Sequence, residues 1–265
     1  MPEGHTLHRL ALDLNDAFGG RTLCVSSPQG RFADSAAQLD GSVLVECTAH
    51  GKHLFCEFES DVYLHVHLGL IGKFRITSPT PPRGAVRVRF ETTEAVGDLR
   101  GPILCALKTP AEIGLQIAQL GPDPLRDDSD PEVAWERISR SRRSIAALLM
   151  DQKVLSGVGN VYRAEVLFRA RINPHRTGVQ LMRRSWDAIW ADLLELMPQG
   201  VLDKRINTVR PEHLAQLFAV QGRRGSRNYV YRRTGQPCWV CGSTVRTEVM
   251  AGRNLFWCPR CQRRG

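Results

Sequence analysis

Four cysteines near the end of the chain constrain its fold more than any other feature. They form two Cys-x-x-Cys pairs, Cys238/Cys241 and Cys258/Cys261, which are separated by sixteen residues. Each pair places two thiolates on one side of a tight turn, and two such pairs complete a tetrahedron around one ion. We therefore expect one structural Zn²⁺ ion that is held by all four cysteines and has no open coordination position.

The positive charge of the chain is concentrated around these cysteines. Residues 222–265 contain ten Arg, no Lys and one acidic residue, so their net charge of +9 equals the formal net charge of the whole chain. A metal-bound hairpin with this charge is suited to contact phosphates. Charge alone fits DNA, RNA or an anionic membrane surface, but the sequence contains no basic amphipathic helix, which disfavours a membrane.

Length and hydropathy predict a cytoplasmic protein without a membrane anchor. The 265 residues suffice for two domains, and no apolar run approaches the roughly 20 residues that span a bilayer. The first residues do not show the basic and apolar segments of a secretion signal. Cys24, Cys47, Cys56 and Cys105 are interpreted as reduced core thiols, with a disulfide framework as the less favoured alternative.

The first 120 residues are predicted to form one helix followed by an antiparallel β-sandwich. Apolar residues recur at helical spacing from Thr6 to Phe18, where Thr6 is a candidate cap and Gly19 a candidate stop. From about Thr22 to Thr92, short runs of alternating apolar and polar residues are separated by turn clusters, as in a sandwich of short strands.

Helical periodicity returns after a Pro/Asp-rich stretch at 121–131, which we interpret as a linker. Helices are predicted at 144–155, at 160–170 and at about 185–196, and the finger should follow as a β-hairpin. The predicted fold class is α+β, with the N-terminal helix and sandwich in residues 1–120, the linker in 121–131, a helical domain in 132–222 and the zinc finger in 223–265.

Two positions are suited to amine chemistry. With Met1 removed, Pro2 is a secondary amine whose pKa near ~7.7 leaves part of it unprotonated and able to attack a sugar carbon. The N-terminal end of the next helix disfavours a nearby ammonium, and Glu3 could act as general acid or base. Lys52 follows Gly51 in a predicted turn, and Lys can give up a proton where Arg cannot. Taken alone, Pro2 also fits a residue that permits Met removal, and Lys52 a solvated turn residue.

The segment from Gly157 to Asn160 joins two predicted helices. Gly157 and Gly159 would let the backbone approach a phosphate, and the helix from Asn160 would offer its amide-rich N-terminus to the anion. A plain helix stop followed by a helix cap explains the same residues equally well.

Two further patterns also have two interpretations. His65 and His67 lie on one face of a predicted strand, where buried, hydrogen-bonded histidines are favoured over a metal site that would need His50 or His53 as a third ligand. Leu70 lies in an apolar turn that either packs in the core or enters a base stack as a wedge.

The order of these motifs resembles the formamidopyrimidine-DNA glycosylase/endonuclease VIII family along the whole chain. The resemblance is closest to the endonuclease VIII branch in its actinobacterial form. The motifs that carry it are Pro2-Glu3-Gly, Gly51-Lys52, His67-Leu-Gly-Leu-Ile-Gly72, Leu120-Gly-Pro-Asp-Pro-Leu125, Gly157-Val-Gly-Asn-Val-Tyr-Arg-Ala-Glu165 and the four-Cys finger.

The resemblance implies four catalytic residues. Pro2 corresponds to the nucleophile that forms a Schiff base with C1′ of the damaged nucleotide, and Glu3 to the general acid/base. Lys52 corresponds to the hairpin Lys that contacts phosphate and supports elimination. Arg253 corresponds to the finger Arg that clamps phosphates around the flipped nucleotide and is linked to δ-elimination.

The resemblance also implies a DNA-binding set and a partner. Leu70 matches the wedge, and Asn160, with Gly157 and Gly159, matches the phosphate contact of a helix–two-turn–helix motif. The implied partner is damaged double-stranded DNA, with single-stranded or bubble DNA left open. A bacterial, nucleoid-associated monomer with one structural zinc and no catalytic metal or organic cofactor is expected.

Several positions depart from the family pattern. Thr6 stands where many relatives have a second acid, and Gln119 where relatives often have Arg. Residues 98–102 replace a longer loop that supplies an Arg and a Phe to the gap in the stack, and residues 206–231 are too short for a loop that covers 8-oxoguanine. Both departures favour oxidised pyrimidines as substrates.

The expected activity is therefore that of a bifunctional DNA glycosylase and AP lyase of base excision repair, with β- and δ-elimination. One alternative is a damaged-DNA-binding protein that has the fold without the chemistry. Another is a metal-dependent nuclease that uses His65 and His67.

Overall fold

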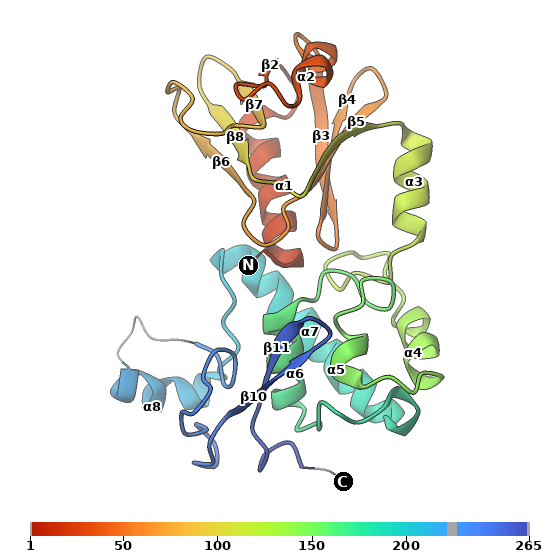
Figure 1. Ribbon diagram of the computed structural model, residues 1–265, viewed down its shortest axis with the longest axis vertical. Coiled ribbons are helices and arrows are strands. Elements are labelled where there is room, and N and C mark those ends of the chain that lie inside the picture. Colours follow the sequence, from red (N-terminus) through yellow and green to blue (C-terminus); the bar gives the residue numbers. More distant parts are fainter. Residues whose placement is uncertain (1, 222–226, 264–265) are drawn as a thin grey trace. The chain divides into compact units, whose positions relative to one another are not determined.

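The computed structural model describes residues 2–221 and 227–263, and the chain divides after Gln119 into two compact units (Figure 1). The stretch interpreted as a linker, 121–131, falls in the second unit. Its backbone is tied there, because the Gly121 N–H donates to the Gln152 carbonyl at 2.8 Å and the Ser156 N–H donates to the Pro122 carbonyl at 3.0 Å.

The first unit is an antiparallel β-sandwich with one long helix, as its sequence pattern predicts. Its two sheets have the strand orders β1-β3-β4-β5-β9 and β2-β7-β8-β6, and every strand pair is antiparallel. The elements are α1 Gly4–Phe18, β1 Arg21–Thr22, β2 Cys24–Ser26, α2 Ala33–Leu39, β3 Val43–His50, β4 His53–Phe58, β5 Val62–His67, β6 Lys73–Thr77, β7 Val88–Glu91, β8 Val96–Arg100, β9 Leu104–Lys108 and α3 Pro110–Ala118.

Helix α1 begins three residues earlier than a cap at Thr6 would place it. Glu3 is the N-cap, and a capping box joins Glu3 to Thr6, so Thr6 is the third helical residue instead of the cap. The reason is reciprocal hydrogen bonding: the Glu3 side chain accepts from the Thr6 backbone, while the Thr6 hydroxyl accepts from the Glu3 N–H at 3.3 Å. The helix ends before Gly19, as predicted.

The core of the first unit lies where α1 meets both sheets. Leu14 and Phe18 are fully buried, and Phe18 meets Phe90 edge-to-face with ring centroids 5.9 Å apart. Cys47 and Cys56 are buried thiols, as expected, but the expectation for Cys24 is wrong. Cys24 is exposed, because in β2 only the central residue of the short strand points into the core.

The second unit is helical and ends in a β-hairpin. Its elements are α4 Pro131–Ser139, α5 Ile145–Leu148, α6 Asn160–Arg169, the 3₁₀ helix η1 Gly178–Gln180, α7 Arg183–Asp203, α8 Pro211–Gln221, β10 Arg246–Met250 and β11 Arg253–Trp257. The helix predicted at 185–196 is longer at both ends. Helix α7 begins at Arg183 and continues through Pro198 to Asp203.

The helix predicted at 144–155 is wrong beyond Leu148. After α5 the chain turns at Asp151, whose backbone carbonyl accepts from the N–H groups of Val154 and Leu155 at 2.9 and 3.0 Å. The Asp151 carboxylate also accepts a hydrogen bond, from the Lys153 N–H at 3.1 Å. An aspartate that bonds the backbone two residues ahead favours a turn over a helix.

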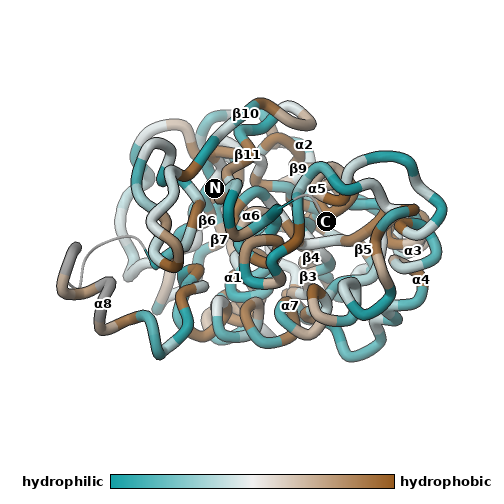
Figure 2. Tube along the Cα trace, turned by 90° about the horizontal axis from the view of Figure 1, so that it is seen from below, coloured by the Kyte–Doolittle hydropathy of each residue, from teal (hydrophilic) through white to brown (hydrophobic). Residues whose placement is uncertain are grey.

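Helix α6 lies between two apolar cores and is buried from Asn160 to Phe168. Tyr162 and Val166 belong to the core of the helices, whereas Ala164 and Phe168 belong to the core of the finger. In Figure 2 apolar and polar residues are interspersed along the tube. No helix in residues 2–221 or 227–263 combines the length and apolar character needed to cross a bilayer.

Candidate active site, phosphate-binding turns and zinc centre

The start of α1 places Pro2 beside a buried carboxyl group. Pro2 is half-buried directly before the N-cap Glu3, and Glu3 is completely buried. His5, in the first turn, is buried, and burial followed by nearby positive charge lowers its pKa to about 4. His5 is therefore neutral at physiological pH, while the positive end of the helix dipole disfavours an ammonium at Pro2.

Lys52 occupies the tight turn between β3 and β4. The flanking residues His50 and His53 pair across the two strands, so the turn consists of Gly51 and Lys52 alone. Gly51 has a φ of +58°, a conformation in which glycine is favoured at the first position of such a hairpin turn. The half-buried Lys52 is thereby fixed at the end of the hairpin.

Leu70 lies in the turn between β5 and β6 and is 52% exposed. The Gly72 N–H donates to the Leu68 carbonyl at 3.0 Å, which closes the turn. Ile71 and Ile103 are exposed beside it at 79% and 70%, so three large apolar side chains point into solvent there. The turn is therefore not packed in the core, and the core alternative for Leu70 is wrong.

Figure 1 shows the start of α1, the β3–β4 turn and the β5–β6 turn at the same end of the first unit. Pro2, Glu3, Lys52 and Leu70 come from these three segments. The residues that the sequence singles out in the first unit are thus gathered at one end of the sandwich.

The histidines of β4 and β5 cluster, but without the geometry of a shared ion. His53 Nδ1 lies 2.8 Å from His65 Nε2, which is a hydrogen-bond distance, and His65 is buried. Within the described residues, the only group of three or more His, Cys, Asp or Glu ligand atoms close enough to hold one metal is the set of four cysteines. The preference for hydrogen-bonded histidines over a metal site is consistent with this arrangement.

In the second unit, the side chain of Gln152 organises the segment that precedes α6. It accepts a hydrogen bond from the Gly157 N–H at 3.0 Å and donates to the Val158 carbonyl at 3.0 Å. Gly157 has a φ of +83°, which a residue with a Cβ atom rarely adopts. Gly159 is the N-cap of α6, so the amide-rich end of this helix follows directly.

Asn160 is joined to the finger hairpin. Its amide donates to the Asn254 carbonyl at 2.9 Å, and its side-chain oxygen accepts from the fully buried Arg163. Arg163 also reaches the carbonyls of Met250 and Ala146. Asn160 is only 4% exposed, and it is thereby tied to the strand that Arg253 begins.

Arg253 lies at the tip of the β10–β11 hairpin and is exposed. The turn residues Ala251 and Gly252 have φ values of +51° and +70°. These two left-handed residues match the twist of the strands and reverse the chain in a tight turn. Arg253 therefore begins its strand directly after this turn.

The four cysteines fit a tetrahedral zinc ion. All four sulfur atoms lie within 4.8 Å of one another, and Cys238 Sγ to Cys261 Sγ and Cys241 Sγ to Cys258 Sγ measure 3.8 and 3.4 Å. A tetrahedron with Zn–S bonds near 2.3 Å has sulfur–sulfur edges of about 3.8 Å. The chemistry of four thiolates and the spacing together indicate a structural site.

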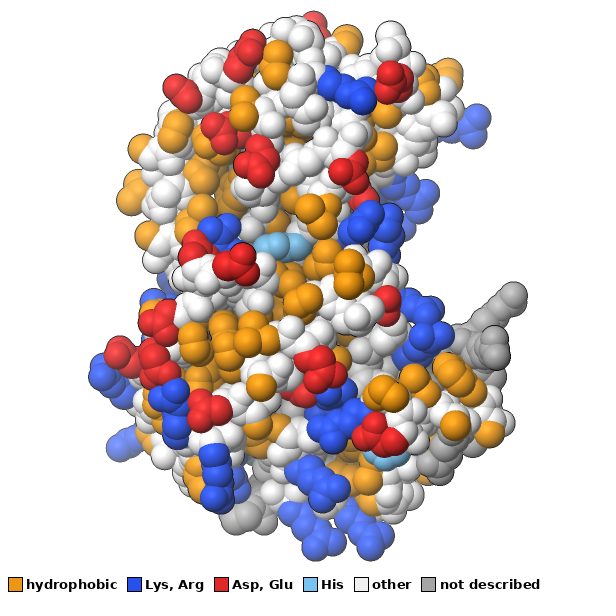
Figure 3. Space-filling model, turned by 180° about the vertical axis from the view of Figure 1, so that it is seen from behind, with side chains coloured by type: hydrophobic (Ala, Val, Ile, Leu, Met, Phe, Trp, Pro, Cys, Tyr) orange, Lys and Arg blue, Asp and Glu red, His pale blue; other side chains and the backbone are white. Residues whose placement is uncertain are grey.

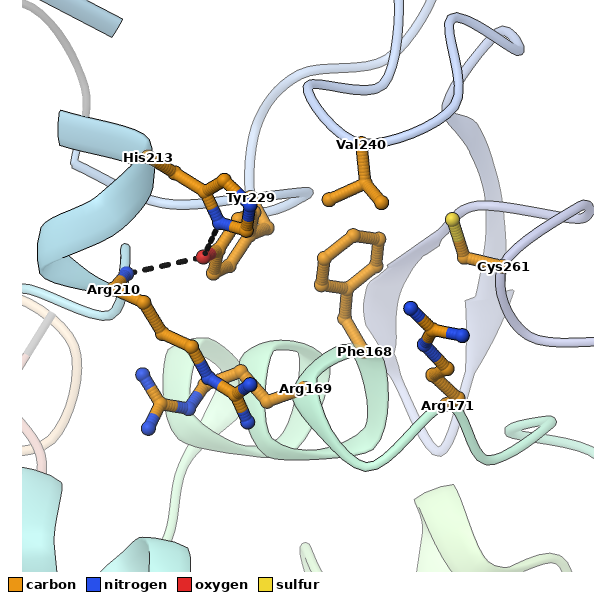
Figure 4. Close-up of a pocket in the computed structure, with 8 residues that line it drawn as sticks. All are labelled: Phe168, Arg169, Arg171, Arg210, His213, Tyr229, Val240 and Cys261. Carbon is orange, nitrogen blue, oxygen red and sulfur yellow. Dashed lines mark hydrogen bonds between the residues drawn. The ribbon is translucent and has the colours of Figure 1, made fainter. Parts of the chain in front are cut away.

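A small pocket of about 110 Å³ is lined by Cys261, one of the four clustered cysteines (Figure 4). Phe168 and Tyr229 stack within it, with ring centroids 4.7 Å apart. The Tyr229 hydroxyl accepts from the Arg210 N–H at 3.0 Å and lies 2.7 Å from His213 Nδ1. These contacts connect α6 and α8 to the segment that leads into the finger.

Glu165 binds the backbone of residues 229–231, in the segment that leads into the finger. Its buried carboxylate accepts from the backbone N–H groups of Tyr229, Val230 and Tyr231 at 2.7–2.8 Å. Burial raises the pKa of Glu165, and these hydrogen bonds oppose that shift.

On the face drawn in Figure 3, Lys and Arg side chains recur over the second unit.

Sequence reasoning missed the supporting roles of His5, Gln152, Arg163 and Glu165. Arg163 and Glu165 stand within the motif that begins at Gly157, and their charge was a sequence signal for a structural role. An Arg and a Glu inside an otherwise apolar helix must be bonded when the helix is buried on all sides. Part of the 206–231 segment, whose length argued against a long covering loop, lies outside the described residues.

Family profiles match most of the chain. The formamidopyrimidine-DNA glycosylase N-terminal domain matches residues 1–101, the formamidopyrimidine-DNA glycosylase H2TH domain matches residues 120–210, and the zinc finger found in FPG and IleRS matches residues 235–264.

Two curated relatives and one solved structure extend this likeness over the full length. Endonuclease 8 1 of Mycobacterium tuberculosis is 52% identical over 268 residues, covering 99% of this chain and 100% of that protein. Formamidopyrimidine-DNA glycosylase of Thermus thermophilus is 33% identical over 270 residues, covering 100% and 98%. The Lactococcus lactis Fpg, solved with abasic-site DNA, has a TM-score of 0.82 at 21% identity and covers 99% and 100%, which establishes a shared fold.

Proposed function

The chain belongs to the formamidopyrimidine-DNA glycosylase/endonuclease VIII family, and from this premise we propose that it is a bifunctional DNA glycosylase and AP lyase. Its substrate is damaged double-stranded DNA, from which it removes oxidised bases. It acts as a monomer, with zinc as a structural ion and without a catalytic metal or organic cofactor.

Pro2 is the nucleophile of the proposed reaction. After removal of Met1, its nitrogen lone pair attacks C1′ of the damaged nucleotide and the bond from C1′ to the base breaks. Glu3 delivers the proton that the departing base or the opening sugar ring requires. The nitrogen of Pro2 loses its proton, and cleavage of the C1′–O4′ bond then opens the sugar ring and leaves an iminium between Pro2 and C1′. The iminium makes the C2′ proton acidic, and its loss expels the 3′ phosphate in β-elimination. A second loss of a proton expels the 5′ phosphate in δ-elimination.

The remaining residues hold the DNA. Leu70, assisted by the exposed Ile71 and Ile103, fills the gap that the extruded nucleotide leaves in the stack. Lys52 contacts a phosphate and supports elimination. Arg253 and the turn from Gly157 to Asn160 bind phosphates on either side of the lesion.

We assign a preference for oxidised pyrimidines over 8-oxoguanine. The connection between β8 and β9 consists only of residues 101–103, which leaves no room for a longer loop that would reach into the gap. The wedge is therefore apolar, with Leu70, Ile71 and Ile103 as its large exposed side chains.

The observation that supports this proposal most is the position of Glu3. A completely buried carboxyl group caps the helix that begins immediately after Pro2. A nucleophilic amine and an acid/base group thus occupy adjacent residues at a helix N-terminus, where a positive charge on the amine is disfavoured.

Borohydride trapping tests the proposal. The untagged protein, with Pro2 exposed, should form a covalent adduct with an abasic-site duplex, because borohydride reduces the iminium to a stable amine. A matched preparation that retains Met1 should bind the duplex but form no adduct.

Adduct formation, together with a strand-cleavage assay in EDTA, separates the alternatives. A damaged-DNA-binding protein without the chemistry would bind the duplex and give no adduct in either preparation. A metal-dependent nuclease would lose strand cleavage in EDTA, whereas cleavage through the iminium should persist in EDTA.

A further inference from the structure

Two like charges face each other at one end of the four-stranded sheet. Lys73 is the first residue of β6, and Arg100 is the last residue of β8. They are direct partners in the antiparallel β6–β8 pair, so their side chains leave the same face of the sheet (Figure 1). Residues that face each other in this way have Cβ atoms about 5 Å apart, and like charges at such positions are destabilising.

The acidic residues of this sheet do not neutralise the pair. The Asp98 carboxylate binds both Arg89, at 3.1 Å, and Arg100, at 2.7 Å. Lys73 is exposed and forms no ion pair among the residues that the structure describes. Strands β6, β7 and β8 together contain four basic and two acidic residues, so their net charge is 4 − 2 = +2. The charge of Lys73 is therefore available to an anion from outside the chain.

Protection of a sheet edge does not explain this pairing. Strand β6 is the edge strand of its sheet, and charged side chains on an edge discourage pairing with other chains. Arg75 fits that use, because it lies on the same strand opposite the acidic Asp98. Lys73 lies opposite Arg100 instead, so its position costs stability that an edge charge does not require.

The like-charge pair adjoins the turn proposed as a wedge. Lys73 directly follows this turn, and Arg100 directly precedes the connection 101–103, which contains the exposed Ile103. The turn and the connection are packed together, since a Cβ atom at Gly72 would lie 3.0 Å from the Gly101 carbonyl oxygen. The two cations and the exposed apolar side chains therefore occupy the same end of the sheet.

We propose that Lys73 and Arg100 bind a backbone phosphate of the strand opposite the lesion while the wedge is in the base stack. The inference rests on the proposed wedge function of Leu70. In the proposed function, Lys52, Arg253 and the turn at 157–160 bind phosphates around the lesion, and the opposite strand has no phosphate ligand. An ammonium and a guanidinium side by side can bind one phosphate together, and its negative charge offsets their repulsion.

Lys73 is the better residue to change, because Arg100 also bonds Asp98 and the Arg83 carbonyl within the sheet. Lys73→Gln removes the charge, whereas Lys73→Arg keeps it. Arg75→Gln is the matched control, since Arg75 is exposed on the same face of β6, two residues farther from the wedge.

The probe is a duplex with a tetrahydrofuran abasic-site analogue, whose binding is followed by fluorescence anisotropy at several salt concentrations. We expect Lys73→Gln to reduce the slope of log affinity against log salt by about one, and Lys73→Arg and Arg75→Gln to leave it near the wild-type value. The unfolding temperature of Lys73→Gln should not fall, because the substitution removes a repulsion.

Neutral methylphosphonate linkages, placed one at a time near the analogue, locate the phosphate. One such linkage in the opposite strand should weaken binding of the wild-type protein and should weaken that of Lys73→Gln no further. Coupling of Lys73 to a linkage of the damaged strand instead would contradict the inference.

An unchanged salt slope in Lys73→Gln would overturn the inference. An equal reduction in Arg75→Gln would overturn it as well, because the sheet would then act through its general charge and not through this pair. Failure of the proposed function is a different result, since it would remove the borohydride adduct of the wild-type protein and leave this binding comparison intact.

Discussion

Two hairpins of this molecule present one basic residue each from a tight turn, but they surround it differently. Lys52 follows Gly51 in the β3–β4 turn, is half-buried and precedes His53, whose pKa is lowered to about 3 by burial. Arg253 follows Ala251 and Gly252 in the β10–β11 turn and is exposed in the segment that holds the net charge of the chain. The turn presents the residue in both cases, whereas burial and neighbours determine its task.

These different surroundings indicate different tasks for Lys52 and Arg253. A guanidinium keeps its charge at every accessible pH and is suited to phosphate binding. The position of Arg253 depends on the finger, which contains the four-cysteine cluster. An amine can also transfer a proton, and its position depends on the strand pairing and the histidines. Binding strength should therefore respond mainly to changes in the finger, and turnover mainly to changes in the first unit.

The largest expected effect is that of Cys258→Ser. Three ligands hold zinc more weakly than four, and loss of the ion should disorganise the finger, so we expect affinity for an abasic-site duplex to fall by roughly 100-fold or more. Metal analysis and fluorescence anisotropy measure the two losses together. Cys24→Ser, an exposed thiol of the first unit, is the matched control and should change neither. Unaltered affinity in a zinc-free variant would contradict the claim that binding strength depends mainly on the finger.

Lys52→Arg sharpens the comparison, because it keeps the charge and removes the ability to give up a proton. We expect elimination to slow by roughly 100-fold, because this is the usual contribution of one proton-transfer group to a rate. The affinity for the abasic-site duplex should hardly change. Single-turnover cleavage of an abasic-site duplex measures the rate. The reciprocal variant, Arg253→Lys, should keep most of its cleavage rate. Equal losses in both variants would mean that the two hairpins share one task.

Arg253→Ala should have a smaller effect on binding. Removal of one phosphate contact should lower affinity by roughly tenfold and reduce the slope of log affinity against log salt by about one. Titrations at several salt concentrations provide both values. A slope identical to that of the wild-type protein would mean that Arg253 contacts no phosphate.

The smallest effect concerns stability of the first unit in mild acid. The pKa of His65 is lowered to about 4, below the value near ~6.5 in an unfolded chain. The unfolded state therefore binds more protons between these values, so stability is complete above pH ~6.5 and falls as the pH approaches 4. His65→Gln should lose about 1 kcal/mol less than the wild-type protein between pH ~7 and ~5.5 in urea unfolding. Parallel pH dependence of the two proteins would contradict a neutral, buried His65.

Much of this architecture can be predicted from the sequence because particular residues have few structural uses. Two Cys-x-x-Cys pairs indicate a tetrahedral metal site, and alternation in residues 62–68 indicates a strand in a sandwich. The turn at Gly51-Lys52 follows from a glycine between two strand patterns. These local rules agree with the structure because nothing in the tertiary packing opposes them.

Other features depend on contacts that periodicity cannot reveal. Helical spacing continues past Leu148, but Asp151 bonds the backbone ahead of it and ends the helix. Thr6 fits a cap, yet Glu3 takes that place because the capping box is reciprocal. The roles of Gln152, Arg163 and Glu165 require specific bonding partners, most of them distant in sequence, and single residues do not identify such partners.

Peptide mapping of the reduced enzyme–DNA conjugate by mass spectrometry shows directly whether the amine of Pro2 bonds to the deoxyribose. We expect the sugar remnant on the N-terminal peptide, attached to the nitrogen of Pro2. Attachment to Lys52 or to any other amine would contradict it.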